Sequence, residues 1–163
     1  MDVLSKIISV EKLATRLDVA RRSGKKIVFT NGCFDILHVG HVRYLAAARS
    51  EGDLLVVGLN SDASMRLIKG NQRPIIPQHH RAEVLASLKF LDYVVLFDTP
   101  DPLALIQKLR PDVLVKGEDW AEPNIVGAEF VKSNGGRVAR IPLVPEVSTS
   151  KIIQRILELH RGD

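Results

Sequence analysis

Short apolar runs alternate along the chain with segments in which apolar residues recur at helical spacing. Runs of this length that are rich in Val, Leu and Ile predict strands buried on both faces of a parallel sheet. Parallel neighbours need long crossovers, and the helical segments between the runs can supply them. The expected strands are Ile27–Phe29, Leu54–Leu59, Tyr93–Phe97, Val113–Val115 and Val138–Ile141.

The intervening segments carry helix start and stop signals. Ser9 followed by Glu11 favours an N-terminal helix over about residues 9–23. Pro102 suits the first turn of a helix that ends near Leu109, and Asn134-Gly135-Gly136 is typical of a helix stop and turn. Further helices are expected from about His38 to Ser50, Gln78 to Lys89, Ile125 to Asn134 and Ser150 to His160.

This alternation predicts an α/β fold, a Rossmann-like three-layer sandwich with a parallel sheet of about five strands. The length of 163 residues fits one domain, and we find no repeat, low-complexity segment or linker. We therefore expect residues 1–163 to form a single domain with its core over about 25–160.

Composition narrows the classes of partner. The formal net charge of +4 is too small and too dispersed to indicate a nucleic-acid surface, although it suits an anionic metabolite. Cys33 is the only cysteine, which is compatible with a reducing cytosol. No apolar run approaches the roughly 20 residues of a membrane span, and Asp2 and Lys6 interrupt the first apolar stretch. We expect a cytoplasmic protein that binds neither nucleic acid nor membrane.

Most of the polar chemistry follows the predicted strands. In an open α/β sheet, ligands bind beyond the carboxyl ends of the strands, where the strand order reverses. The stretches that come after strands are Thr30–His41, Asn60–Arg73, Lys116–Trp120 and Leu143–Ser150. We expect these four stretches to form one ligand site.

The strongest motif runs from Thr30 to His41, where a strand, a glycine turn and the start of a helix follow one another. A helix N-terminus attracts phosphate through its free N–H groups and its partial positive charge. His38 and His41 lie one turn apart, and their imidazoles can donate hydrogen bonds and carry charge near neutral pH. Gly40 lets a phosphate approach the backbone. The motif predicts a site that stabilises negative charge on a splitting phosphate chain.

Other interpretations of these residues stay open at this point. A pair of histidines can be half of a metal site, but no further ligand at standard spacing accompanies this one. The pair can also cap a helix, and Lys69 and Arg73 can be solvated loop charges. Neither a P-loop nor a Gly-x-Gly-x-x-Gly motif is present.

The segment from Gly32 to Asp35, followed by His38-Val39-Gly40-His41, resembles the signature of the HxGH nucleotidyltransferase superfamily, which includes the cytidylyltransferases. This resemblance implies in-line attack on the α-phosphate without a covalent intermediate, and Mg²⁺ held mainly by the triphosphate. Lys69-Gly70 with Arg73 looks like a mobile basic loop of this group. The Val147–Ile152 stretch looks like the one that opens its final helix.

The resemblance implies a role for each matching residue. The expected catalytic residues are His38, His41 and Lys69, and we expect no protein metal ligands. The expected nucleotide-binding residues are Thr30, Asn31, Gly32, Phe34, Gly40, Lys116, Gly117, Asp119, Ser148, Thr149 and Ser150. The expected acceptor-binding residues are Asn60, Asp62, Arg73 and Arg81.

Within the superfamily, the pattern is most similar to the D-glycero-β-D-manno-heptose 1-phosphate adenylyltransferases of bacterial ADP-heptose synthesis. This similarity covers about residues 25–156 and implies ATP and a sugar 1-phosphate as substrates, with a separate heptose kinase as supplier. The product would enter lipopolysaccharide core or a related glycan. Apolar strands near a sheet edge are compatible with a homodimer.

Two alternatives remain. Glycerol-3-phosphate cytidylyltransferases carry an Arg-Thr-x-Gly lead-in where this chain has Leu143–Glu146, so the expected arginine is absent and Lys69, Lys116 and Lys151 would have to face the phosphates. The other alternative is a nucleotide-binding module that has kept the fold without the chemistry.

Overall fold

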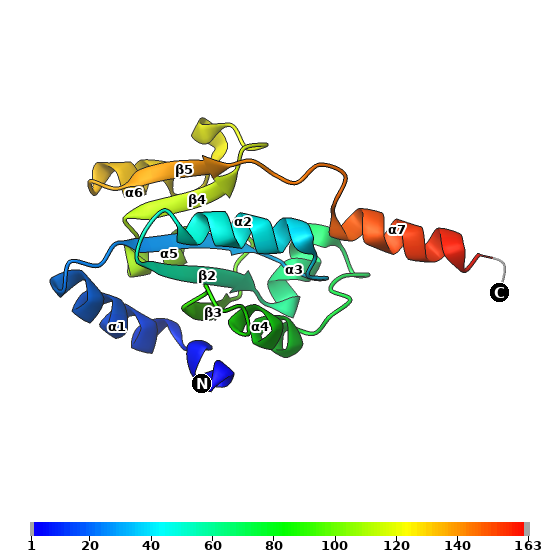
Figure 1. Cartoon of the computed structure of the whole chain (residues 1–163), viewed down its shortest axis with the longest axis horizontal. Coiled ribbons are helices and arrows are strands. Elements are labelled where there is room, and N and C mark those ends of the chain that lie inside the picture. Colours follow the sequence, from blue (N-terminus) through cyan, green and yellow to red (C-terminus); the bar gives the residue numbers. More distant parts are fainter. Residues whose placement is uncertain (1, 162–163) are drawn as a thin grey trace.

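The computed structural model describes residues 2–161 and contains a five-stranded parallel sheet (Figure 1). The strand order is β3-β2-β1-β4-β5. The chain adds β2 and β3 on one side of β1 and then returns to add β4 and β5 on its other side. The predicted Rossmann-like sheet is confirmed. The strands are β1 (Ile27–Gly32), β2 (Leu54–Asn60), β3 (Tyr93–Phe97), β4 (Val113–Gly117) and β5 (Arg137–Ile141).

Helices cover both faces of the sheet. The apolar residues of α2 and α4 pack on one face, and those of α1, α5 and α6 pack on the other. The α-helices are α1 (Val10–Arg22), α2 (Val39–Arg49), α3 (Asp62–Lys69), α4 (Gln78–Ala86), α5 (Leu103–Leu109), α6 (Ala128–Ser133) and α7 (Thr149–Leu159). Two short 3-10 helices, η1 (Val3–Lys6) and η2 (Glu122–Asn124), complete the elements.

Alternation along the strands divides the core between the two helical layers. In β1, Val28 belongs to the cluster with α2 and α4, whereas Ile27 and Phe29 belong to the cluster with α1, α5 and α6. Successive strand side chains point to opposite faces, so an uninterrupted apolar strand supplies both clusters. The sheet is therefore buried on both sides, and polar side chains collect at the ends of its strands.

Three segments differ from the sequence-based expectation. No helix is predicted over residues 62–69, but they form α3, because the Ser61 hydroxyl caps its N-terminus by accepting the N–H of Ser64 at 3.2 Å and Met65 is fully buried. α4 ends at Ala86, three residues before the expected end. α6 begins only at Ala128, because η2 and then Gly127 at φ 87° precede it.

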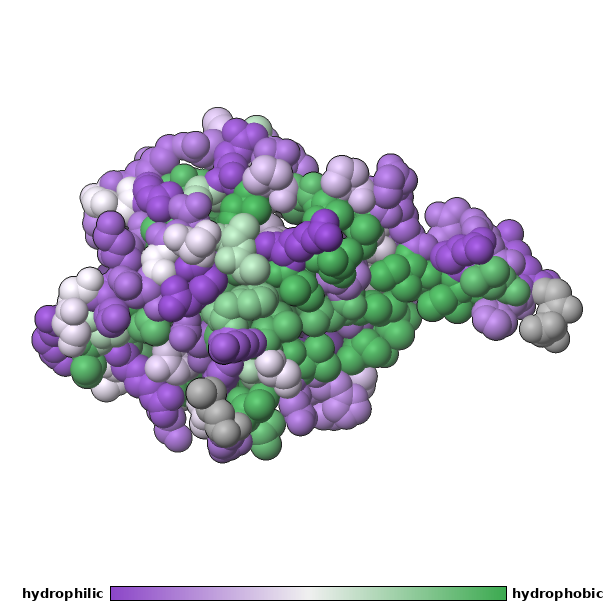
Figure 2. Space-filling model, in the orientation of Figure 1, coloured by the Kyte–Doolittle hydropathy of each residue, from purple (hydrophilic) through white to green (hydrophobic). Residues whose placement is uncertain are grey.

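α7 extends away from the body of the molecule (Figure 1), and none of its residues is buried. Ile156, Leu157 and Leu159 are each at least half exposed on it. Figure 2 shows apolar side chains that continue from the body onto this helix. Among residues 2–161, no helix is long and apolar enough to span a membrane.

The central strand offers a test of the packing. Phe29 is 1% exposed in β1, so Phe29→Ala should lower the free energy of unfolding by about 3–5 kcal/mol, through lost burial and a residual cavity. Leu67→Ala, at a side chain that is 73% exposed, should change it by about 0.5 kcal/mol or less. Urea unfolding measures both values. Equal losses would contradict the assignment of Phe29 to the core.

Candidate functional site

A cavity of about 600 Å³ opens at the carboxyl ends of β1 and β4, where the strand order reverses. The four expected stretches all contribute to its wall. A volume of this size suits a small-molecule or nucleotide ligand. The expected site residues that line it are Asn31, Gly32, Phe34, His38, Gly40, His41, Asn60, Lys69, Arg73, Lys116, Gly117, Asp119, Ser148, Thr149 and Ser150.

The two histidines meet at the start of α2. His38 is the N-cap, and its Nδ1 accepts the backbone N–H of His41 at 3.4 Å. The two rings stack with centroids 3.7 Å apart and planes inclined by 21°. A Cβ added at Gly40 would lie only 3.0 Å from the His38 ring, so the glycine makes room for this stack. Both imidazoles are thereby held at a helix N-terminus on the cavity wall.

The electrostatics of the pair differ from those of exposed histidines. Burial, and to a smaller extent the neighbouring His38, lowers the pKa of His41 to about 4. Burial also lowers the pKa of His38. Within residues 2–161, Nδ1 of His41 is buried without a hydrogen-bond partner. At pH 7 without a ligand, His41 is therefore neutral, and it would gain charge only beside an anion.

Lys116 brings a poorly hydrated cation to the same wall. Its ammonium donates to Asn31 Oδ1 across the ends of β4 and β1. Burial lowers the pKa of Lys116 to about 8, and the nearby Asp119 carboxylate opposes this shift. A phosphate would replace part of the lost hydration, so the geometry favours an anionic ligand here.

Three expected ligand residues do not line the cavity. Thr30 is fully buried beneath it, and its hydroxyl lies 2.8 Å from that of Tyr44. Arg81 is 2% exposed, and its guanidinium donates to Cys33 O at 2.5 Å, to Ile76 O at 2.9 Å and to Asp62 Oδ1 at 2.7 Å. With its donors satisfied inside the protein, Arg81 acts as a structural residue, and Asp62 serves as its partner rather than as a cavity wall.

Other expected residues lie at the site with their polar groups already engaged. Asn60 lines the cavity, but its amide donates to Ser64 Oγ at 3.1 Å and to Thr99 O at 3.4 Å. Ser148 caps α7 by accepting the N–H of Lys151 at 3.2 Å. The Lys151 ammonium pairs with Glu146 at 2.9 Å, so it is not directed to the cavity as expected.

Sequence reasoning missed two residues that shape the site. Tyr44 lines the cavity and donates to Val115 O at 3.2 Å, and burial raises its pKa to about 12. Asp35 lines the cavity wall next to Arg73. The place of Asp35 within the signature could have identified it from sequence, whereas nothing in the sequence pointed to Tyr44.

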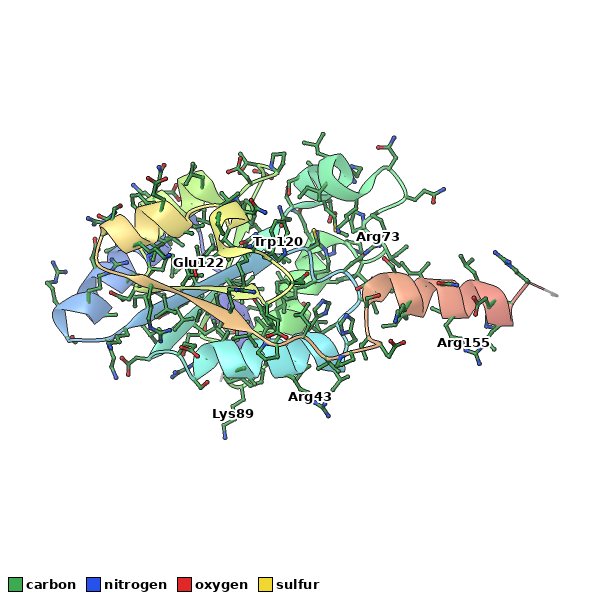
Figure 3. The ribbon with its side chains drawn as sticks, turned by 90° about the horizontal axis from the view of Figure 1, so that it is seen from above. Arg43, Arg73, Lys89, Trp120, Glu122 and Arg155 are labelled. Carbon is green, nitrogen blue, oxygen red and sulfur yellow. The ribbon has the colours of Figure 1, made fainter. Side chains whose placement is uncertain are left out.

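Figure 3 shows Arg73 and Trp120 on one side of the sheet and Arg43 on the other.

Among the residues that the structure describes, no three His, Cys, Asp or Glu side chains gather to hold a metal ion. The cavity wall instead presents two imidazoles with Lys69, Arg73 and Lys116. A divalent cation fits this wall only as the companion of a polyphosphate, because hard cations require several oxygen ligands.

A doubly wound sheet with a cavity at its switch point, lined by two imidazoles and by Lys69, Arg73 and Lys116, is typical of a nucleotide-binding α/β domain. The chain belongs to the cytidylyltransferase-like family, whose model matches residues 29–155. The bifunctional protein HldE of Syntrophotalea carbinolica is 58% identical over 94% of this chain and 31% of that protein. HldE of Geobacter sulfurreducens is 54% identical over 98% of this chain and 31% of that protein. The chain thus spans about a third of the length of these relatives.

Solved structures agree on the fold. A lipopolysaccharide core biosynthesis protein from Thermoplasma volcanium superposes with a TM-score of 0.64 at 29% identity, covering 74% of this chain and 99% of that one. A pantoate-beta-alanine ligase from Francisella tularensis superposes with a TM-score of 0.63 at 18% identity, covering 96% of this chain and 79% of that one. At this identity the match shows a shared fold alone. The family model and the HldE relatives confirm the predicted nucleotidyltransferase class.

The buried His41 predicts a pH dependence of stability. Its folded pKa of about 4 lies below its unfolded value, so the unfolded chain binds the extra proton more readily. The contribution of neutral His41 to the free energy of unfolding is complete above about pH 6.5, the unfolded pKa. It is lost as the pH falls toward the folded pKa. Between pH 7 and pH 5, the wild type should therefore lose roughly 2 kcal/mol more of its free energy of unfolding than His41→Gln, as measured by urea unfolding. His80→Gln, at an exposed histidine, should match the wild type. Equal losses in all three proteins would exclude this role of His41.

Proposed function

We propose that the chain transfers AMP from ATP to D-glycero-β-D-manno-heptose 1-phosphate and so forms ADP-heptose and pyrophosphate. The observation that carries this proposal is the stacked pair His38 and His41 at the N-terminus of α2, facing the cavity. The signature around the pair resembles heptose 1-phosphate adenylyltransferases. The similarity to HldE, at 58% and 54% identity, supports this choice among nucleotidyltransferases.

In the proposed reaction, an oxygen of the sugar phosphate attacks the α-phosphorus of ATP. The new P–O bond forms as the bond between the α-phosphorus and the bridging oxygen to the β-phosphate breaks, and pyrophosphate leaves with those electrons. The attacking oxygen is already ionised, so no general base is needed. The protein then acts mainly by alignment and by neutralising charge.

The geometry suggests how the wall divides this task. His38 and His41 would donate to the phosphate chain from the helix N-terminus, where backbone N–H groups add to their effect. Lys116 would approach from β4, whereas Lys69 and Arg73 would approach from the end of α3 and the loop that follows it. Nucleotidyltransferases of this kind generally use Mg²⁺, which would arrive with ATP and supply neutralisation of the triphosphate charge.

The proposed acceptor implies a preceding kinase reaction that places phosphate on the anomeric oxygen of a heptose. The HldE relatives are bifunctional, and about two thirds of their length lies outside the match, which leaves room for a second activity in those proteins. The product would supply lipopolysaccharide core or a related glycan. The similarity to the lipopolysaccharide core biosynthesis protein of Thermoplasma volcanium supports this assignment.

Pyrophosphate release tests the substrates directly. ATP and CTP should each be combined with heptose 1-phosphate and with glycerol 3-phosphate. We expect release only with ATP and heptose 1-phosphate. Release only with CTP and glycerol 3-phosphate would overturn the substrate assignment but keep the reaction class. ATP binding without release from any pair would favour a non-catalytic module.

Replacing His41 tests the proposed chemistry. His41→Ala should lower turnover by roughly 10²–10³, the scale of removing one transition-state donor. His80→Ala, at an exposed histidine on α4, is the matched control and should turn over like the wild type. Steady-state pyrophosphate release measures both, with thermal melting to verify folding. Unchanged turnover in folded His41→Ala would exclude the proposed role.

A further inference from the structure

The side chain of Asp35 is fully buried, yet it is a carboxylate at the wall of the cavity, next to Arg73. Its Oδ1 accepts the backbone N–H groups of Ile75 at 2.9 Å and Ile76 at 2.8 Å. Its Oδ2 accepts Nε of Arg73 at 2.6 Å and lies 3.0 Å from the Ile75 nitrogen. Burial would raise the pKa of Asp35, but these donors hold it below its usual value. Asp35 is therefore ionised at neutral pH.

The contact with Arg73 uses only one edge of the guanidinium. Nε is bound to Asp35, and within residues 2–161 the Arg73 side chain makes no other hydrogen bond, although it lines the cavity. A guanidinium carries five N–H donors in a rigid plane, so the four on its two terminal nitrogens remain for a ligand. Fixing Nε also fixes the plane in which those donors lie, and planar donors suit a phosphate.

We infer that Asp35 is a positioning residue that orients Arg73 toward a phosphate group in the cavity. This inference rests on the proposed function for its effect on catalysis, but not for its effect on phosphate binding. Arg81 differs from Arg73 in this respect, because its guanidinium donates hydrogen bonds to Cys33 O, Ile76 O and Asp62 inside the protein. Of these two arginines, only Arg73 keeps free donors at the wall.

Contacts of the neighbouring Arg81 allow the positioning role of Asp35 to be tested without loss of the fold. Arg81 independently joins Cys33 to the segment that contains Ile76, so this segment does not rely on Asp35 alone. In Asp35→Asn, the amide oxygen can still accept the N–H groups of Ile75 and Ile76. The amide NH₂ would then face Nε of Arg73, and two donors repel each other. This substitution should release Arg73 while it keeps the backbone contacts.

Asp92 provides a matched control. Its carboxylate also joins an arginine Nε to a backbone N–H, with Arg49 at 3.3 Å and Leu55 at 2.8 Å. Asp92 directly precedes β3 and contacts the amino end of β2, outside the cavity wall. Asp92→Asn therefore repeats the chemical change without touching the site.

The experiment compares Asp35→Asn, Arg73→Gln, the double variant and Asp92→Asn. Calorimetric titration with pyrophosphate should give affinities weakened about tenfold in the first two, no further loss in the double variant, and a wild-type value for Asp92→Asn. Pyrophosphate release should show the same pattern in kcat/KM, with losses of roughly 10–100-fold, the scale of a misplaced contact. Non-additivity is expected because both changes remove one interaction.

Three outcomes would overturn the inference: wild-type binding in Asp35→Asn, losses that multiply in the double variant, or an equal loss in Asp92→Asn. If melting shows that Asp35→Asn does not fold, Arg73→Lys takes its place, since it keeps the charge without the planar fork. Wild-type binding in Arg73→Lys would then overturn the inference. A wild type that binds pyrophosphate but releases none from any substrate pair contradicts the proposed function, while the titrations still decide the role of Asp35.

Discussion

The limited pairing between β1 and β4 is the constraint on which the site depends. β1 pairs with β2 over six residues, from Ile27 to Gly32, but with β4 only at Val28 and Phe29. Beyond these two residues the strands separate, and the Lys116 ammonium reaches Asn31 across the opening. The cavity thus exists because the ladder stops early, at the position where strand order reverses and helix N-termini converge.

This opening determines the electrostatics of the wall. His41 stays neutral and Lys116 has a lowered pKa because both lose water without gaining a full counter-charge. A polyphosphate would supply that charge, so the free protein is prepared for an anion rather than for a cation. Preorganised donors of this kind stabilise charge that develops during a reaction without reorganising at that moment.

The sequence predicted the fold well, because uninterrupted apolar strands and capped helices are local signals. It also predicted most of the cavity wall, because strand ends in a parallel sheet share one edge. Arg81, Asp62 and Thr30 do not line the cavity as expected. For Arg81 the reason is that an arginine bound to backbone carbonyls and one bound to phosphate look alike in sequence. α3 was missed, although Ser61 as N-cap and Asp62 in the first turn form a helix start signal. The roles of the remaining wall residues stay proposals.

The contacts of the basic residues determine which of them can reach a ligand and in which direction they point. Arg81 and Lys151 are satisfied by protein partners, and of the basic residues discussed only Lys69, Arg73 and Lys116 reach the wall. Two of these three are themselves held by oxygen acceptors, Arg73 by Asp35 and Lys116 by Asn31. Such contacts reduce the net attraction for any anion but fix the direction of the donors. Under the proposed function, a phosphate would then be recognised by the geometry of fixed groups, which is the condition for aligning two substrates for in-line transfer.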